Sequence, residues 1–301
     1  MTTRPGWETL PNEVQDAVAE RLGSPAVLWE TQRGGFSPGL AERLVLADGR
    51  RLFVKIVDTV KQPSTATLHR REAEVLRTLP SSLPIAALVD AFDADNHYVL
   101  VLEDIDGHHP AVADTGAVLD ALTALARSSG PPGLPRARAE FVADHGAWER
   151  LRSVPPTVSD IHDAVITAAG SLLEAVDGES LTHFDARADN MLIDAYGSVR
   201  IVDWPWAVAG APWIDPLMYL VDVLVRDPAA PAEAWLAHDA FAGASDQHID
   251  AILAGIAGSW YECAEQPSPP GMPTLREFQR READAAVLLL RRRWSARRLS
   301  R

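Results

Sequence analysis

The hydrophobic pattern of this chain changes from a strand-like to a helix-like repeat after Gly107, and this change limits the fold to a mixed class. Before that point the pattern predicts two helices, over 10–22 and 65–79, and four strands, over 27–33, 40–46, 51–57 and 97–103. After it the pattern predicts helices over 113–128, 138–150, 158–177, 213–226, 231–243, 247–265 and 275–299. We therefore expect an α+β fold.

The chain is longer than one compact core usually allows, because it has 301 residues. We expect two lobes with a site between them, divided near residue 105. Residues 1–105 would form a small lobe with an antiparallel sheet, since Asp48-Gly49 is typical of a hairpin turn. Residues 106–301 would form a larger, mainly helical lobe, interrupted by short apolar pieces at 191–193 and 199–202.

The charge and the cysteine content exclude several classes of function. The formal net charge is −14, which argues against nucleic acid as the main partner, because phosphate backbones attract clustered Lys and Arg. The single cysteine, Cys263, allows neither an internal disulfide nor a cysteine-rich zinc site. The sequence contains no apolar run long enough for a membrane span and no signal-peptide pattern, so we expect a cytoplasmic protein. It carries no signal for the oligomeric state.

The end of the chain has the opposite charge from the rest. Residues 276–301 contain nine Arg and three acidic residues. We interpret the Arg cluster at 291–301 as a solvated helix end, where positive charge also suits the helix dipole.

The segment 181–206 is the most informative about chemistry. It reads His183-x-Asp185-x4-Asn190, followed by an apolar strand pair and Asp203. Asp185 and Asn190 can project from one irregular loop, and a short hairpin can return Asp203 to meet them. Carboxylate and amide oxygens suit Mg²⁺, which takes its other ligands from water and substrate phosphates. This leaves Asp185 to accept the proton of an attacking hydroxyl.

These residues resemble the aminoglycoside phosphotransferase family, within the protein-kinase-like group that includes choline and fructosamine kinases. The resemblance covers roughly residues 25–220. It implies a two-lobe protein-kinase-like fold and a catalytic loop carrying Asp185, with Asn190 and Asp203 as ligands of Mg²⁺. Trp213-Ile-Asp-Pro216 resembles the family's anchoring motif, so we expect Asp215 to brace the backbone of the catalytic loop.

The same resemblance implies a nucleotide site in the first third of the chain. Lys55 would contact the α- and β-phosphates of ATP, held by Glu72, with Glu74 as the alternative partner. Lysine is rare here: Lys55 and Lys61 are the only two, against 26 arginines. Backbone groups near Glu103 and Ile105 would contact the adenine.

The catalytic loop departs from the family pattern at one position and also holds a basic residue, Arg187. Phe184 replaces the usual Gly, so we expect a backbone that differs from the glycine form. Arg187 lies two residues after Asp185, and we hypothesise that it neutralises charge on the γ-phosphate. We interpret His183 as structural, and Asp189 either as a turn residue or as a substrate contact.

The glycine-rich segment 33–39 lies between two predicted strands, as a phosphate-covering loop would, and Ser37 could donate to a phosphate oxygen. The segment Gly35-Phe-Ser-Pro-Gly39 also matches the G-x-S-x-G motif of serine hydrolases. That alternative is weak, because the oxyanion hole needs the N–H of the residue after the serine and Pro38 has none.

Together these features predict an enzyme that moves the γ-phosphoryl group of ATP, with Mg²⁺, to a hydroxyl of a small molecule such as an aminoglycoside, an amino sugar or a related metabolite. The alternatives are a nucleotide-binding pseudokinase with a regulatory role and, less favoured, a serine hydrolase using Ser37.

Overall fold

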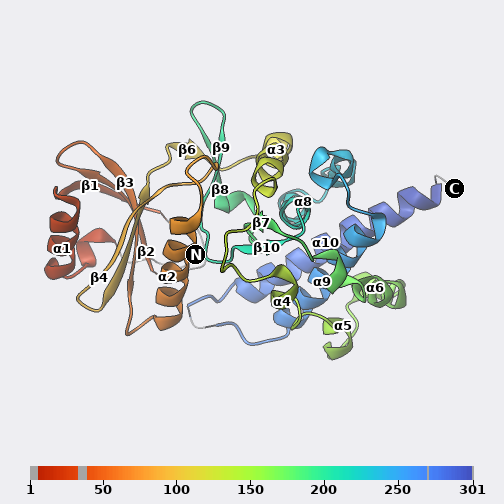
Figure 1. Ribbon diagram of the computed structural model, residues 1–301. Coiled ribbons are helices and arrows are strands. Elements are labelled where there is room, and N and C mark those ends of the chain that lie inside the picture. Colours follow the sequence, from red (N-terminus) through yellow and green to blue (C-terminus); the bar gives the residue numbers. More distant parts are fainter. Residues whose placement is uncertain (1–5, 33–38, 270, 300–301) are drawn as a thin grey trace. The chain divides into compact units, whose positions relative to one another are not determined.

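The computed structural model describes residues 6–32, 39–269 and 271–299 (Figure 1). The chain divides into two compact units. The first contains the residues up to His108 together with Met191–Pro205 and residues 271–272, and the second contains His109–Asn190, Trp206–Pro269 and the residues from Pro273 onward. The α+β class is confirmed, whereas the division at residue 105 stays a prediction.

The first unit is built on a five-stranded antiparallel sheet in the order β1-β2-β3-β5-β4. Its strands are β1 (Ala26–Thr31), β2 (Leu40–Leu46), β3 (Arg51–Asp58), β4 (Leu88–Ala94) and β5 (His97–Glu103). The predicted hairpin joins β2 and β3, and Gly49 in its turn has a φ of 88°, which favours glycine. Strand β4 was not predicted, because Asp90 and Asp93 interrupt its apolar pattern; pairing with the buried β5 stabilises it.

Two helices accompany the sheet in the first unit, α1 (Asn12–Leu22) and α2 (Pro63–Thr78). Helix α1 ends at Gly23, which has a left-handed φ of 72°. Its buried Val14, Val18 and Leu22 belong to one apolar cluster with side chains of β2, β3 and β5. This cluster stabilises the strands that carry the candidate site residues of the first unit.

A small three-stranded sheet, in the order β6-β8-β9, also belongs to the first unit. It consists of β6 (Gly107–His108), β8 (Met191–Asp194) and β9 (Val199–Ile201). A Cβ atom at Gly107 would lie 2.5 Å from the Ile193 carbonyl oxygen, so this close pairing requires glycine. Ile201 forms a bridge with Ile85. Residues from the middle of the chain are thereby held against its first third.

The second unit is mainly helical. Its longer helices are α3 (Thr115–Ala126), α6 (His162–Ala169), α8 (Ile214–Arg226), α9 (Asp246–Ala264) and α10 (Leu275–Leu299). Helices α4 (Ala137–Glu140), α5 (Ala147–Arg150) and α7 (Leu172–Ala175) are single turns, and strands β7 (Ser180–Thr182) and β10 (Val208–Gly210) pair antiparallel. None of the helices in the described ranges is both long and apolar enough to cross a membrane.

Three predicted helices are wrong in extent. The segment 138–150 contains only α4 and α5, because Gly146 between them has a φ of 78°. The segment 158–177 is divided at Gly170, with α6 before it and α7 after it. The segment 231–243 forms two 3-10 helices, separated by the extended backbone of His238.

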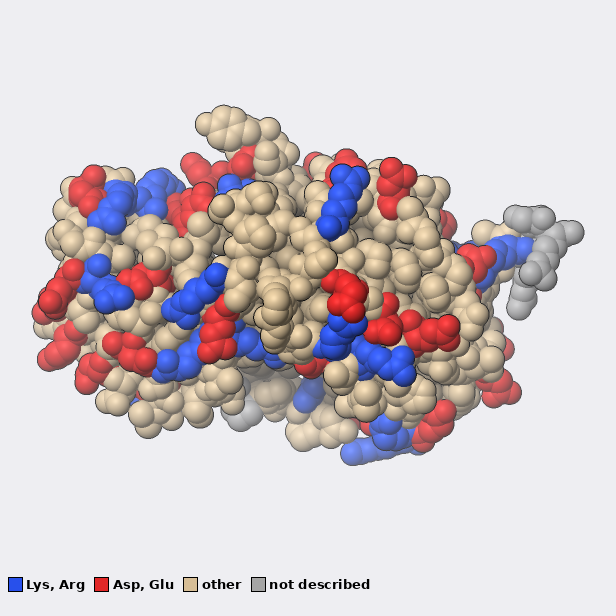
Figure 2. Space-filling view, viewed as in Figure 1, with Lys and Arg blue, Asp and Glu red and all other residues tan. Residues whose placement is uncertain are grey.

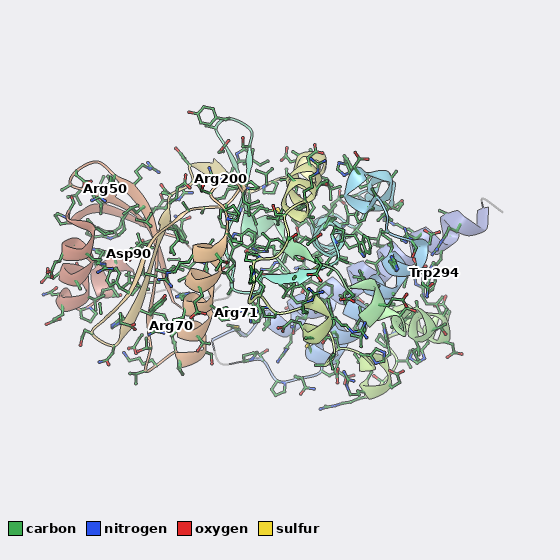
Figure 3. The ribbon with its side chains drawn as sticks, viewed as in Figure 1. Arg50, Arg70, Arg71, Asp90, Arg200 and Trp294 are labelled. Carbon is green, nitrogen blue, oxygen red and sulfur yellow. The ribbon has the colours of Figure 1, made fainter. Side chains whose placement is uncertain are left out.

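Where the side chains of α10 are described, its terminal arginines pair with acidic side chains, so the interpretation as a solvated helix end is wrong there. Arg293 is buried and pairs with Asp246 and Asp250 of α9, each at 3.0 Å. Arg297 pairs with the same two carboxylates. Trp294, labelled in Figure 3, donates to Asp250 at 2.8 Å. These side chains fasten α10 to α9. Elsewhere on the face shown in Figure 2, acidic and basic side chains are interspersed.

Candidate active site

Lys55 is the centre of a partly buried ionic cluster in the first unit. It lies on β3, opposite Ala41 of β2 and Leu100 of β5. Its Nζ donates to Oε1 and Oε2 of Glu72 at 3.0 and 2.8 Å and to Oδ1 of Asp203 at 2.7 Å. Burial alone would lower the pKa of Lys55, but Asp203 and Glu72 raise it above its ordinary value. Lys55 therefore stays cationic.

The other two members of the cluster are held by the backbone around them. Burial raises the pKa of Glu72, an effect that Lys55 opposes. The backbone N–H of Trp204 donates to Glu72 at 3.4 Å, and its indole N–H donates to the Ile201 carbonyl at 3.1 Å. Asp203 has a φ of 68°, in the left-handed region. Such backbone costs about 1–3 kcal/mol and is kept where the surroundings determine it.

The end of β5 and the segment after it carry the two residues expected near a nucleotide base, Glu103 and Ile105. The N–H of Glu103 donates to the Ala87 carbonyl at 2.9 Å. Its carboxylate accepts from the Ala87 N–H and from Arg200. The carbonyl of Ile105 accepts from Arg43 at 2.9 Å. The N–H and the side chain of Glu103 thus both brace the segment, and Arg43 holds the Ile105 carbonyl.

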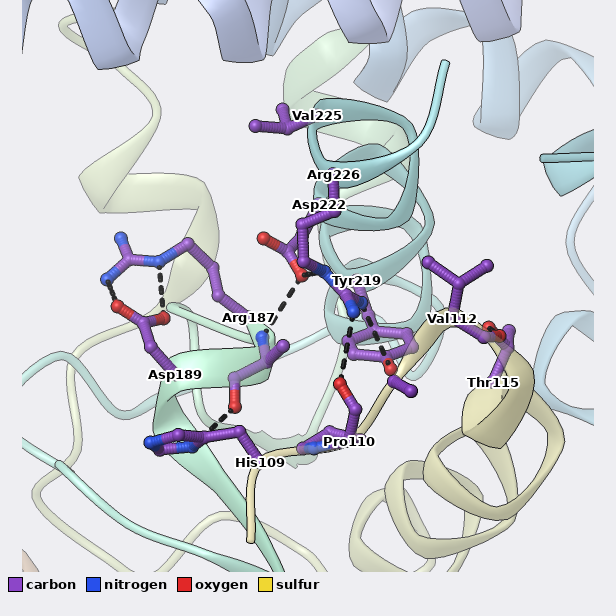
Figure 4. A network of polar contacts seen from close by, with 12 residues as sticks. His109, Pro110, Val112, Thr115, Arg187, Asp189, Tyr219, Asp222, Val225 and Arg226 are labelled. Carbon is purple, nitrogen blue, oxygen red and sulfur yellow. Dashed lines mark hydrogen bonds and ion pairs between the residues drawn. The ribbon is translucent and has the colours of Figure 1, made fainter. Parts of the chain in front are cut away.

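The loop 183–190 of the second unit holds a chain of polar contacts. Arg187 donates to Asp185 at 2.9 Å. It also donates to both oxygens of Asp189 at 3.0 and 3.1 Å (Figure 4). Asn190 donates from Nδ2 to the Asp185 carbonyl at 2.8 Å and to Oδ2 of Asp185 at 2.9 Å. Burial lowers the pKa of Arg187, but Asp185 and Asp189 outweigh it and raise the pKa. Asp189 thus holds Arg187, and its role as a turn residue or as a substrate contact stays a prediction.

Two buried carboxylates of α8 hold the backbone of this loop. Asp215 accepts from the N–H groups of His183 and Phe184 at 2.6 and 2.8 Å, which confirms the bracing role expected for it. Asp222 accepts from the Ala188 N–H at 3.1 Å and from Arg226 at 2.8 Å (Figure 4). Burial raises the pKa of both carboxylates.

Phe184 keeps a backbone conformation that favours glycine. Its φ is 69°, in the left-handed region, and the expected difference from the family's glycine form stays a prediction. Its ring meets the ring of Phe141 edge-on, with 5.1 Å between centroids. The two hydrogen bonds to Asp215 and this ring contact compensate for the strain.

A protein-family model described as the phosphotransferase enzyme family matches residues 36–248. The chain belongs to this family. The match covers both the Lys55 cluster and the loop 183–190, and it makes the protein a phosphotransferase. A search of curated proteins found no match.

Solved structures share the fold of this phosphotransferase. A thermostable mutant of the aminoglycoside phosphotransferase APH(4)-Ia has a TM-score of 0.59 and 15% identity, over 91% of this chain and 98% of that one. Choline kinase LicA from Streptococcus pneumoniae has a TM-score of 0.58 and 16% identity, over 91% of this chain and 97% of that one. Macrolide 2'-phosphotransferase MphH from Brachybacterium faecium has a TM-score of 0.54 and 15% identity, over 92% of this chain and 98% of that one.

The phosphotransferase brings the predicted residues together in two groups. Lys55, Glu72, Asp203, Glu103 and Ile105 lie in the first unit. The second unit contains Asp185, Arg187 and Asn190. The predicted Ser37 lies outside the described residues. Glu72, and not Glu74, is the partner of Lys55.

Sequence reasoning missed two side chains of α10 that face the loop 183–190. The guanidinium of Arg187 lies 5.3 Å from the centroid of the Phe278 ring. Glu282 is buried, and burial together with nearby carboxylates raises its pKa to about 8, although Arg187 acts against this. The two positions are four apart, so they share one face of the helix. The sequence offered one signal for this contact, because Glu282 lies on the buried face of the helix predicted over 275–299.

Proposed function

We propose that this phosphotransferase moves the γ-phosphoryl group of ATP, with Mg²⁺, to a hydroxyl of a small molecule. The observation that carries the proposal is the Lys55 cluster in a chain of this family: a buried ammonium group, kept charged and aimed by Glu72 and Asp203. A lysine placed in this way can balance phosphate charge without changing its protonation state.

The nucleotide would be held by residues of the first unit. Lys55 would contact the α- and β-phosphates, and the backbone at Glu103 and Ile105 would contact the base. Ser37 would donate to a phosphate oxygen. Two observations support this assignment. Structures with a similar fold are described as complexes with ADP, AMP-PNP or AMP. In the described part of the chain, no hydrogen bond outside the regular strands uses the Ile105 N–H.

Asn190 and Asp203 fit the role of Mg²⁺ ligands by their chemistry. The Nδ2 of Asn190 is used by Asp185. This orientation leaves the amide oxygen as the group that can ligate. The carboxylate of Asp203 is 43% exposed although Lys55 holds one of its oxygens. Hard oxygen donors of this kind suit Mg²⁺. When bound, the ion would supply positive charge to the phosphate groups.

Asp185 would accept the proton of the acceptor hydroxyl. Arg187 and Asn190 each hold one of its oxygens, so the carboxylate is oriented before any substrate arrives. Such positioning is the main source of the rate enhancement in enzymatic phosphoryl transfer. Arg187 would hold Asp185 in place and balance negative charge on the transferred group.

The acceptor is proposed to be an aminoglycoside, an amino sugar or a related metabolite. Two observations support this class. The chain has a net charge of −14, which suits a cationic acceptor. One structure with a similar fold is described as a ternary complex with ADP and hygromycin B.

The test is Mg²⁺-dependent ADP release from ATP over a panel of aminoglycosides, amino sugars, plain sugars, choline-like amines and nucleosides. We expect at least one class to give turnover. In Asp185→Asn, turnover should fall by roughly 10²–10⁴ because the base is lost, while the Kd of ADP should stay within about twofold. Lost ADP binding in that variant would contradict the role given to Asp185.

The same experiment separates the alternatives. A regulatory pseudokinase would bind Mg-ATP without turnover on any acceptor, although the chain retains Lys55, Asn190 and Asp203. A serine hydrolase would hydrolyse an ester substrate and lose that activity in Ser37→Ala.

A further inference from the structure

Arg43 places its guanidinium against the segment expected to bind the nucleotide base. On β2 it lies opposite Phe53 of β3, and Lys55 lies opposite Ala41. Because side chains alternate along a strand, Arg43 and Lys55 project from the same face of the sheet. Arg43 donates from Nη2 to the Ile105 carbonyl at 2.9 Å, and its Nε pairs with Asp104 Oδ1 at 3.2 Å.

This contact is held firmly. The side chain of Asp104 is only 2% exposed, and its second oxygen pairs with Arg51 at 2.9 Å. A guanidinium is planar, so the hydrogen bond to Ile105 and the ion pair with Asp104 together limit its orientation. The Ile105 carbonyl therefore has a charged donor in place before any nucleotide binds.

The two purine bases require different backbone groups. Adenine presents a donor, its 6-amino group, beside an acceptor, N1. Guanine presents an acceptor, O6, beside a donor, N1–H. If the Ile105 N–H meets the base, adenine takes its second contact from the carbonyl of Glu103, two residues earlier. Guanine takes its second contact from the carbonyl of Ile105 itself.

That second carbonyl is the one that Arg43 occupies. A guanine N1–H would have to share the oxygen with a cationic N–H group or displace it. Displacement would leave part of a poorly exposed guanidinium without its partner, which is costly. Adenine meets no such competition. The Arg43 donor would therefore weaken the binding of guanine and leave the binding of adenine unchanged, which is how a site rejects the wrong ligand.

We propose that Arg43 makes the base site select adenine over guanine nucleotides. The inference rests on the proposed function, because it takes the segment around Ile105 as the base site. It adds a specificity-determining residue on β2, two strands away from the backbone that touches the base.

The test compares the Kd of ADP and of GDP, each with Mg²⁺, by isothermal titration calorimetry of the full chain. In the unsubstituted protein ADP should bind at least about tenfold more tightly than GDP. In Arg43→Met this ratio should narrow by about tenfold, mainly through tighter GDP binding, since a charge-assisted hydrogen bond no longer covers the carbonyl.

Arg51→Met is the matched control, because Arg51 pairs with Asp104 but does not touch the Ile105 carbonyl. In Arg51→Met the ratio of the Kd of GDP to the Kd of ADP should equal that of the unsubstituted protein. Arg43→Met should fold, because Arg51 still neutralises the buried Asp104. Arg43→Gln offers a second variant with a neutral donor and should give an intermediate ratio.

Three results would overturn the inference: equal affinities for ADP and GDP in the unsubstituted protein, an unchanged ratio in Arg43→Met, or an equal narrowing in Arg51→Met. Each leaves the proposed function standing, since a nucleotide still binds. Binding of neither nucleotide would reject the proposed function as well.

Discussion

Asp215 shows how much one side chain determines in this protein. Each of its oxygens accepts one hydrogen bond, from the N–H groups of His183 and Phe184. It is buried at 4% exposure. A carboxylate can accept from both N–H groups, whereas an amide has only one oxygen to offer.

We therefore expect Asp215→Asn to destabilise the loop 183–190. One backbone N–H would face an NH₂ group, which costs about 1–3 kcal/mol in a buried site. The melting temperature should fall by several degrees and turnover should fall with it. The exposed Asp239 provides the control, and Asp239→Asn should leave both values unchanged. Equal melting curves for Asp215→Asn and the unsubstituted protein would contradict the bracing role.

At the residue scale, local motifs were readable from the sequence and long-range partners were not. Asp185 and Asn190 lie within five residues of each other, so their contact depends on one loop. The contact of Arg187 with Phe278 depends on a helix about 90 residues later. The left-handed backbone of Phe184 likewise depends on Asp215 and Phe141, which no local pattern reveals.

At the scale of elements, α10 carries the least expected feature. Glu282 of this helix has a pKa raised from 4.5 to about 8, mainly by burial. The folded protein therefore binds a proton there that the unfolded chain releases near pH 4.5. Because the folded state holds more protons, its stability falls as the pH rises between about 4.5 and 8.

Glu282→Gln should remove this pH dependence. The neutral amide imposes no ionisation cost, so the variant should gain stability over the unsubstituted protein as the pH rises from 5 to 8. The difference is at most about 3 kcal/mol at pH 7. Melting temperatures at pH 5 and pH 8 measure it. Asp284→Asn on the same helix controls for lost charge. A parallel pH dependence in Glu282→Gln and the unsubstituted protein would contradict the assignment.

Elements with a strong repeat and clear ends could be predicted, and those with internal breaks could not. Strand β2 and helix α10 match their predicted ranges. The helices predicted over 138–150 and 158–177 kept an apolar repeat across breaks in the helix. Helix α4 ends at Glu140 and α5 begins only after Gly146, and α6 ends before Gly170. Likewise, the arginines of α10 read as solvated because their acidic partners lie on other elements.

At the scale of the whole molecule, the first unit is discontinuous in sequence. It includes Met191–Pro205, which supplies β8, β9 and the carboxylate of Asp203. The chain therefore enters and leaves this unit more than once. A hydrophobic pattern cannot reveal that a mid-chain hairpin belongs with the first third.

We expect a fragment of residues 1–108 to fold poorly on its own, because it lacks the partner of Ile85 and the third member of the Lys55 cluster. Joining residue 108 to 191–205 through a short Gly-Ser linker should restore folding. The linker can be short, since His108 pairs with Ile193. Circular dichroism melts of the two fragments test this. Equal cooperative melts of both would contradict the need for the hairpin.

The scarcity of lysine has a practical consequence for chemical labelling. Lys55 has a raised pKa and a side chain 14% exposed, so it presents almost no neutral amine to an electrophile. Lys61 is 81% exposed. Among the side chains, an amine-reactive dye should therefore attach to Lys61 alone. Three residues beyond β3, that dye would report on the first unit without touching the ammonium group at its centre.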